Sequence, residues 1–288
     1  MSKILEDIKL QYRIGGVANR IIYWNVGIFL LSLVLFYQFR LGKFDYPSWI
    51  ALSSNPKDVL FFPWTLLTYS FLHASFWHLF FNMIMLNFAS RLFLTFFTQK
   101  QYFGLYVLSS IFAGIAFVIS YYFLGIYSSI VGASGAVLAI LVATTTYQPL
   151  MEVRLFLFGN VKLWHITGVF LVLDFMQIML DNTGGHIAHI AGAVFGVVFI
   201  KMLQNGTDLS SIVTSFINFF SNLFQPKKAS PFKKVHVNPK SPAPKRESKI
   251  VTKDKTQQQI DEILDKISKS GYDSLTKDEK EFLFNSGK

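Results

Sequence analysis

The chain has 288 residues, of which 52% are hydrophobic, 15% are charged and none is cysteine. Because soluble domains carry about 25% charged residues, this composition indicates a membrane protein, and the lack of cysteine excludes disulfide, thiolate and cysteine–zinc chemistry. Of the net charge of +10, the tail after residue 204 carries half, and it holds 15 of the 27 Lys and Arg residues. A basic flank beside membrane spans explains that charge better than nucleic-acid binding does, so no nucleic-acid partner is expected.

Six apolar segments predict an all-α polytopic membrane domain over residues 21–204, after a cytoplasmic N-terminus at residues 1–20. A hydrocarbon core about 30 Å thick requires roughly 20 apolar residues of helix. The fourth and sixth segments are short and rich in small residues, which predicts helices buried among other helices. The predicted spans are at about 21–39, 76–97, 103–124, 132–148, 164–181 and 186–204.

Basic residues predict the orientation of these spans. Lys and Arg accumulate before the first span and after the last one, whereas the loops around 125–130 and 181–185 contain neither. An even number of crossings puts both termini on one side, and the positive-inside bias makes that side cytoplasmic. The first loop opposes this orientation with Arg40, Lys43 and Lys57.

The tail after the last span divides in two. Residues 205–255 combine an amphipathic segment, 209–224, with a Lys- and Pro-rich stretch, 225–255, that is typical of a disordered linker. The amphipathic segment either lies on the membrane surface or continues the last span.

Residues 256–288 predict a small helical hairpin. Thr256 with Gln259, and Thr276 with Glu279, have the spacing of capping boxes, and Gly271 is placed to end the first helix. A hairpin of this size buries little surface alone, so we expect it to bind an unknown cytoplasmic partner or to be marginally stable.

Polar side chains mark three places in the apolar domain, and the first holds His73, His78 and Asn82. His78 and Asn82 are four residues apart, so they lie on one face of the predicted helix. Ionisable side chains inside a membrane are costly and usually functional. The alternative is that His73 and Asn82 only form hydrogen bonds between helices.

The second place is Gly132-Ala133-Ser134-Gly135, within a segment, 101–151, that has no charged residue and no histidine. Small residues are common where membrane helices touch, so a packing role is one interpretation. The motif also opens a predicted span. Ser134 is therefore expected at a helix N-terminus, where free N–H groups favour a developing oxyanion.

The third place holds His186 and His189, which share a helical face, followed by Gly192 and Gly196. A Gly-xxx-Gly pair lets a helix approach its neighbour closely. We expect this approach to bring His189 to Ser134, since a base within about 3 Å of a serine can activate it. His186 is expected to have a supporting role.

In this order, on six predicted spans, the three motifs resemble the rhomboid family of intramembrane serine proteases. The resemblance covers about residues 20–204, and the tail resembles one found on some rhomboids of Bacteroidetes-like bacteria. It implies a six-transmembrane-helix bundle in the inner (plasma) membrane. It also implies a serine endopeptidase that needs no cofactor or metal and cleaves transmembrane protein substrates within the lipid bilayer.

The resemblance also implies roles for individual residues. Ser134 would be the nucleophile and His189 the general base, a dyad without a carboxylate that passes through an acyl-enzyme. His78 and Asn82 would form the oxyanion hole with the Ser134 backbone N–H, and His73 would shape the first-loop side of the pocket. Residues implied to support the pocket are Gly132, Gly135, His186 and Gly192.

The sequence departs from the family pattern in three places and leaves other functions open. Thr65 stands where an arginine often follows the tryptophan, Leu138 stands where an aromatic ring usually stacks on the histidine, and Phe93-Leu94 replaces a common acidic position. The alternatives are an inactive rhomboid-like protein that binds membrane-protein clients, a transporter, and a metal site. The metal site would use four histidines: His73, His78, His186 and His189.

Overall fold

The computed structural model describes residues 2–156, 159–178, 182–224 and 255–286. The chain divides into two compact units, Met1–Pro226 and Lys227–Lys288, and each is considered by itself. The predicted linker, apart from Lys255, lies outside the described residues.

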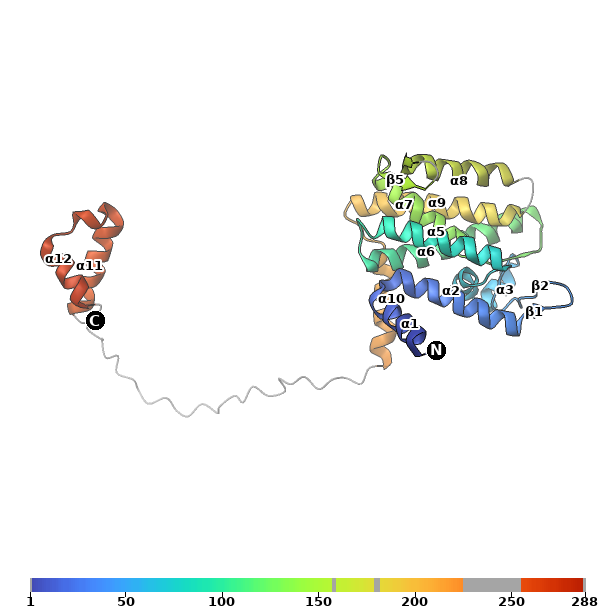
Figure 1. The fold of residues 1–288 in the computed structure, drawn as a ribbon, viewed down its shortest axis with the longest axis horizontal. Helices are drawn as coiled ribbons and strands as arrows, with labels where there is room; N and C mark the ends of the chain where they lie inside the picture. Colours follow the sequence, from blue (N-terminus) through green and yellow to red (C-terminus); the bar gives the residue numbers. More distant parts are fainter. Residues whose placement is uncertain (1, 157–158, 179–181, 225–254, 287–288) are drawn as a thin grey trace. The chain divides into compact units, whose positions relative to one another are not determined.

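Six helices form the bundle of the first unit, and each overlaps one of the six predicted spans (Figure 1). The predicted all-α, rhomboid-like membrane bundle is therefore confirmed. Three of the described helices, α2, α6 and α9, are long and apolar enough to cross a membrane, while α7 and α8 are shorter apolar helices. Six crossings stay a prediction. The bundle helices are α2 (Gly16–Leu35), α5 (Phe76–Phe93), α6 (Gln99–Leu124), α7 (Ser134–Tyr147), α8 (Leu163–Gln177) and α9 (Thr183–Gln204).

Helix α7 is the buried centre of the bundle, as predicted for the fourth span, whereas α9, the sixth, exposes Val194, Val197 and Val198. All its residues from Gly135 to Thr144 are buried, and it contacts α5, α6, α8 and α9. A Cβ added at Gly192 of α9 would lie 2.2 Å from the Gly135 carbonyl oxygen, and one added at Gly196 would lie 2.4 Å from the Ala139 carbonyl oxygen. The two backbones therefore touch because both α9 positions are glycine. Around α7, helices α8, α9, α6 and α2 follow one another side by side (Figure 1).

Short elements between α2 and α5 tie the first loop to the segment before Ser134. Strand β3 pairs antiparallel with β4, so that Leu52 faces Ile130 and Ser53 faces Ser129. A separate hairpin, β1–β2, forms the start of the loop after α2. Another hairpin, β5–β6, joins α7 to α8. These elements are β1 (Tyr37–Gln38), β2 (Lys43–Phe44), β3 (Leu52–Ser53), α3 (Pro56–Phe61), α4 (Thr65–Thr68), η1 (Tyr69–Phe71), β4 (Ser129–Ile130), β5 (Glu152–Leu155) and β6 (Gly159–Lys162).

The first loop is braced by hydrogen bonds at the position where the expected arginine is absent. Trp64 donates from Nε1 to the Trp49 carbonyl oxygen over 2.7 Å. The hydroxyl of Thr65, which is buried at the start of α4, donates to the Phe62 carbonyl oxygen over 2.7 Å. With threonine at position 65, the side chains of Trp64 and Thr65 hold the loop through hydrogen bonds to its backbone carbonyl oxygens.

Two further helices flank the bundle, α1 (Ser2–Ile14) and α10 (Ser210–Phe224). A turn at Gly206, with φ of +86°, separates α10 from α9. The alternative that segment 209–224 continues the last span is therefore wrong. Ser210 is buried beside Gly104 of α6, and Val213 is also buried. Most other apolar residues along α10 are exposed, which favours a surface helix. The exposed residues are Ile212, Phe216, Ile217, Phe219, Phe220 and Leu223.

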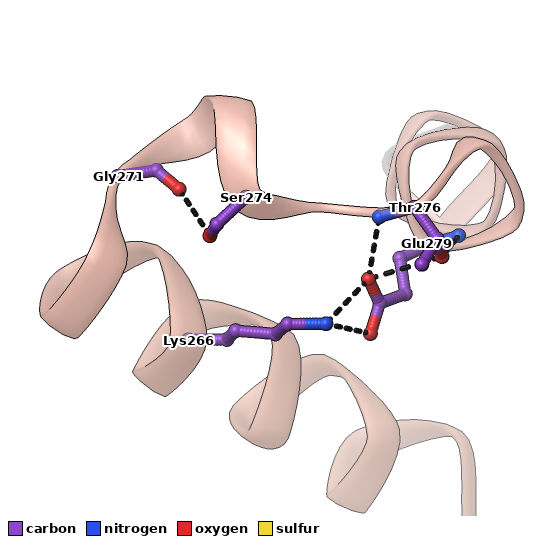
Figure 2. Close-up of polar contacts among 5 residues, drawn as sticks. All are labelled: Lys266, Gly271, Ser274, Thr276 and Glu279. Carbon is purple, nitrogen blue, oxygen red and sulfur yellow. Dashed lines mark hydrogen bonds and ion pairs between the residues drawn. The ribbon is translucent and has the colours of Figure 1, made fainter.

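The second unit is the hairpin of α11 (Lys255–Ser270) and α12 (Lys277–Ser286), joined through η2 (Tyr272–Ser274). Gly271 ends α11 with φ of +77°. At the start of α12 the Thr276 N–H donates to Glu279 Oε2 over 2.7 Å, and Glu279 also accepts from Lys266 Nζ over 2.8 Å (Figure 2). The second predicted capping box is thus formed. The first one is wrong, because Thr256 lies inside α11 and not before it.

Candidate active site

Ser134 is the first residue of α7, as the sequence predicted. Just before it, Gly132 has φ of +136°, a conformation that favours glycine, and its N–H donates to the Tyr69 carbonyl oxygen over 3.0 Å. A Cβ at Gly132 would lie 2.9 Å from His78 Cε1 and 3.5 Å from Ser134 Oγ. Glycine at this position therefore keeps open the space between the histidine and the serine.

The structure brings His189 to Ser134. The distance between His189 Nε2 and Ser134 Oγ is 2.5 Å, within hydrogen-bond reach of a base and the nucleophile that it activates. The close approach of α9 to α7 at Gly192 and Gly135 produces this contact. The close packing of the small-residue motif therefore also brings the candidate base to the candidate nucleophile.

A carboxylate that the sequence analysis missed completes this group. Asp174 Oδ1, on α8, lies 2.8 Å from His189 Nδ1 and 2.6 Å from His186 Nδ1. An ionised carboxylate only accepts hydrogen bonds, so both histidines donate to it from Nδ1. The expected dyad did not include this carboxylate, which lies within hydrogen-bond distance of His189.

The sequence did carry a signal for Asp174. It is an acidic residue inside the predicted fifth span, 164–181, and ionisable residues in a span are expected to face a partner. The prediction of functional residues from ionisable side chains in the spans included the histidines and left out Asp174. Because α8 and α9 are consecutive and in contact, an acid near the end of one is close to histidines near the start of the next.

His78 and Asn82 present hydrogen-bond donors to a cavity that Ser134 lines. The Ala74 N–H donates to His78 Nδ1 over 3.3 Å, which leaves the proton of the neutral ring on Nε2. Asn82 Nδ2 donates to the His78 carbonyl oxygen over 2.8 Å, and its second N–H is left for another acceptor. Both side chains line a cavity that Ser134 also lines.

His73 contacts His78. Its side chain is fully buried, and its ring contacts the His78 ring edge-on at a centroid distance of 5.1 Å. Burial lowers the pKa of His73 to about 3, so the ring is neutral at physiological pH. Tyr46 donates from its hydroxyl to the His73 carbonyl oxygen over 2.9 Å. His73 therefore supports the position of His78 from the first-loop side.

Two cavities meet at the serine. One, of about 300 Å³, is lined mainly by apolar side chains of α5, α7 and α8, such as Met85, Leu138 and Phe170. The other, of about 400 Å³, lies against the loop segment 129–132 and the start of α9. Ser134, Asn82 and His189 line both. An apolar ligand and water could therefore reach the serine from different sides.

The four-histidine metal site is not formed. Among the described residues, the group of metal-ligand type is Asp174 with His186 and His189, and it does not include His73 or His78. The Nδ1 atoms of His186 and His189 both lie at hydrogen-bond distance from Asp174 Oδ1. The arrangement fits two N–H donors sharing an acceptor.

A family model, the rhomboid domain, matches residues 62–205. The chain belongs to the rhomboid family. The match spans α5 to α9 and, apart from Tyr46, every residue of the site described above. It makes this rhomboid a membrane protein of a family associated with intramembrane proteolysis. Residues 251–285, which include most of the hairpin, match a family of unknown function (DUF6576). No curated protein matches the chain.

Proposed function

We propose that this rhomboid is an intramembrane serine endopeptidase. The observation that carries the proposal is the placement of Ser134 Oγ 2.5 Å from His189 Nε2, at the junction of an apolar cavity and a second cavity on the loop side. A transmembrane segment of a substrate protein enters from the apolar side, and water enters from the loop side. No metal or cofactor takes part.

The proposed reaction proceeds through an acyl-enzyme. Ser134 Oγ attacks the scissile carbonyl carbon while its proton passes to His189 Nε2. Asn82 Nδ2, His78 Nε2 and the Ser134 N–H donate to the oxygen that gains negative charge. The C–N bond then breaks as the leaving amine takes the proton from His189, and a water molecule hydrolyses the ester by the same path in reverse.

The length of α7 supports a reaction below the membrane surface. Its 14 residues span about 21 Å, against a hydrocarbon core of about 30 Å. If the far end of α7 reaches one surface, Ser134 lies roughly 9 Å below the other. This depth fits cleavage within or next to a transmembrane helix. With six crossings, both termini are on the cytoplasmic side of the inner membrane.

Cleavage of a model transmembrane substrate in liposomes tests the proposal. We expect the wild type and Ser120→Ala, a matched serine change on α6, to cleave it. Ser134→Ala and His189→Ala should show no cleavage. Persisting cleavage in Ser134→Ala would refute the proposed nucleophile. A wild type that binds transmembrane clients and never cleaves any would instead establish the inactive rhomboid-like function.

A further inference from the structure

We propose that Asp174 is a positioning residue that makes the catalytic group of this rhomboid a Ser134–His189–Asp174 triad. The inference rests on the proposed function. It goes beyond that function because the family resemblance implies a serine and a histidine alone, and the carboxylate comes from this chain's own α8.

The geometry assigns each hydrogen-bonding atom of His189 a single role. Nδ1 lies 2.8 Å from Asp174 Oδ1, and Nε2 lies 2.5 Å from Ser134 Oγ. A carboxylate accepts only, so the proton of the neutral ring is on Nδ1 and Nε2 has a free lone pair. That tautomer is the one able to remove the Ser134 proton. The opposite tautomer would place an N–H against the serine hydroxyl and could not act as a base.

The carboxylate also has a role during the reaction. When Ser134 Oγ bonds to the carbonyl carbon, its proton moves to Nε2 and the ring becomes an imidazolium with both nitrogens protonated. Asp174 stabilises this cation through the Nδ1–H bond and takes no proton itself. When the C–N bond breaks, the Nε2 proton goes to the leaving amine and the ring returns to its starting tautomer.

His186 holds the carboxylate in place. It donates from Nδ1 to the same Oδ1 over 2.6 Å, one helical turn before His189 on α9. The side chains of Asp174, His186 and His189 are only 14%, 12% and 22% exposed, so these hydrogen bonds are largely shielded from water. A carboxylate fixed by two donors has less freedom to rotate away from His189.

The same contacts compensate for a departure in the sequence. Leu138 occupies the position where the family pattern has an aromatic ring stacked on the histidine. Leu138 lines the apolar cavity together with Asp174 and His189. In this chain the orientation of His189 is therefore fixed by the hydrogen bond that it donates to Asp174 on α8 instead of by a ring on α7.

Cleavage kinetics of the full chain in liposomes test the triad. The variants are Asp174→Asn, Asp174→Glu and, as a matched control, Asp45→Asn, which alters a carboxylate that accepts from Gln38 beside the β1–β2 hairpin. We expect Asp174→Asn to lower kcat roughly 10²- to 10⁴-fold. Asp174→Glu should restore part of that rate, and Asp45→Asn should retain the wild-type rate.

The pH profile distinguishes positioning from a merely structural role. The titratable groups around His189 are Asp174 from α8, His186 from α9 and His78 from α5. Removing the carboxylate makes the His189 imidazolium less stable, so the acidic midpoint of the Asp174→Asn rate profile should move to lower pH. A wild-type rate in Asp174→Asn, or a lower rate with an unmoved midpoint, would overturn the proposal.

A spectroscopic readout on the wild type is independent of protease activity and does not require an Asp174 variant to fold. Nitrogen-15 spectra of histidine-labelled wild type, with His189 assigned through His189→Gln, should show neutral His189 protonated at Nδ1. A proton on Nε2 would overturn the triad even if the enzyme is active. If the wild type does not cleave but shows the Nδ1–H tautomer, the proposed function fails while the positioning by Asp174 holds.

Discussion

At the scale of single residues, the site depends on atoms that a single methyl group would displace. Ser134, His189, His78 and Asn82 could be selected from the sequence because a histidine or serine in an apolar span is unusual. Their placement together follows from helix geometry and small residues. Asp174 could not be paired with His189 from spacing alone, because its contact crosses between two helices whose mutual rotation is set by packing.

The first prediction concerns Gly192. A Cβ there would lie 2.2 Å from the Gly135 carbonyl oxygen, so Gly192→Ala should push α9 away from α7. We expect a loss of roughly 1–3 kcal/mol in the free energy of unfolding and a loss of cleavage. Thermal unfolding in detergent measures the first effect. The control is Gly168→Ala on α8, where an added Cβ meets nothing within 4 Å. Equal stability of the two variants would contradict the close contact.

The second prediction concerns Asn82. If its free N–H stabilises the oxyanion, Asn82→Ala should lower kcat roughly 10- to 1000-fold, because one donor is lost and others are still present. Steady-state cleavage measures this, and the control is Asn87→Ala, which changes a half-buried asparagine of the same helix that accepts a hydrogen bond from Arg91. A loss as complete as in Ser134→Ala would count against this division of roles.

At the scale of helices and loops, the sequence predicted which helices exist better than it predicted where each helix begins and ends. The six apolar segments overlap six helices, but α2 begins at Gly16 and α5 ends at Phe93, several residues from the predicted limits, because hydropathy does not mark where backbone hydrogen bonding stops. The short elements of the first loop were not predicted. Their pairing with segment 129–130 joins positions more than seventy residues apart, which local patterns do not encode.

The third prediction concerns the hairpin of α11 and α12. Lys266 and the Thr276 N–H hold the pKa of Glu279 down at about 2. The stabilisation by this carboxylate is therefore complete above the ordinary glutamate pKa and is lost as pH falls from about 4.5 towards 2. The protection factors of the α12 amides in the full chain, which compare the observed exchange with that of an unstructured amide at the same pH, should fall over this range. In Glu279→Gln the protection factors should be lower at neutral pH and should lack this acid-induced fall. A wild type whose α12 protection factors are insensitive to the drop in pH would contradict the ion pair.

At the scale of the whole molecule, composition and motif order were enough to predict a rhomboid membrane domain, and the family match at residues 62–205 confirms it. Helices α1 and α2 and most of the first loop lie outside that match, so their place in the bundle is known from packing alone. The fold of the hairpin follows from capping and periodicity, but these patterns do not indicate whether it binds a partner.

The fourth prediction concerns orientation. The chain has no cysteine, so single introduced cysteines report topology without background. In intact cells a membrane-impermeant maleimide should label Tyr127→Cys, in the exposed loop before Ser134, and should not label Lys3→Cys or Asn285→Cys. Labelling of the terminal positions, with Tyr127→Cys protected, would reverse the proposed orientation.

The central claim is that Ser134 is a nucleophile activated by His189, and active-site labelling tests it most directly. The purified protein in detergent is treated with a fluorophosphonate, and the modified peptide is identified by mass spectrometry. The account predicts a single adduct on Ser134, which is lost in Ser134→Ala and strongly reduced in His189→Ala. An unlabelled Ser134 in folded protein, or equal labelling with and without His189, would contradict it.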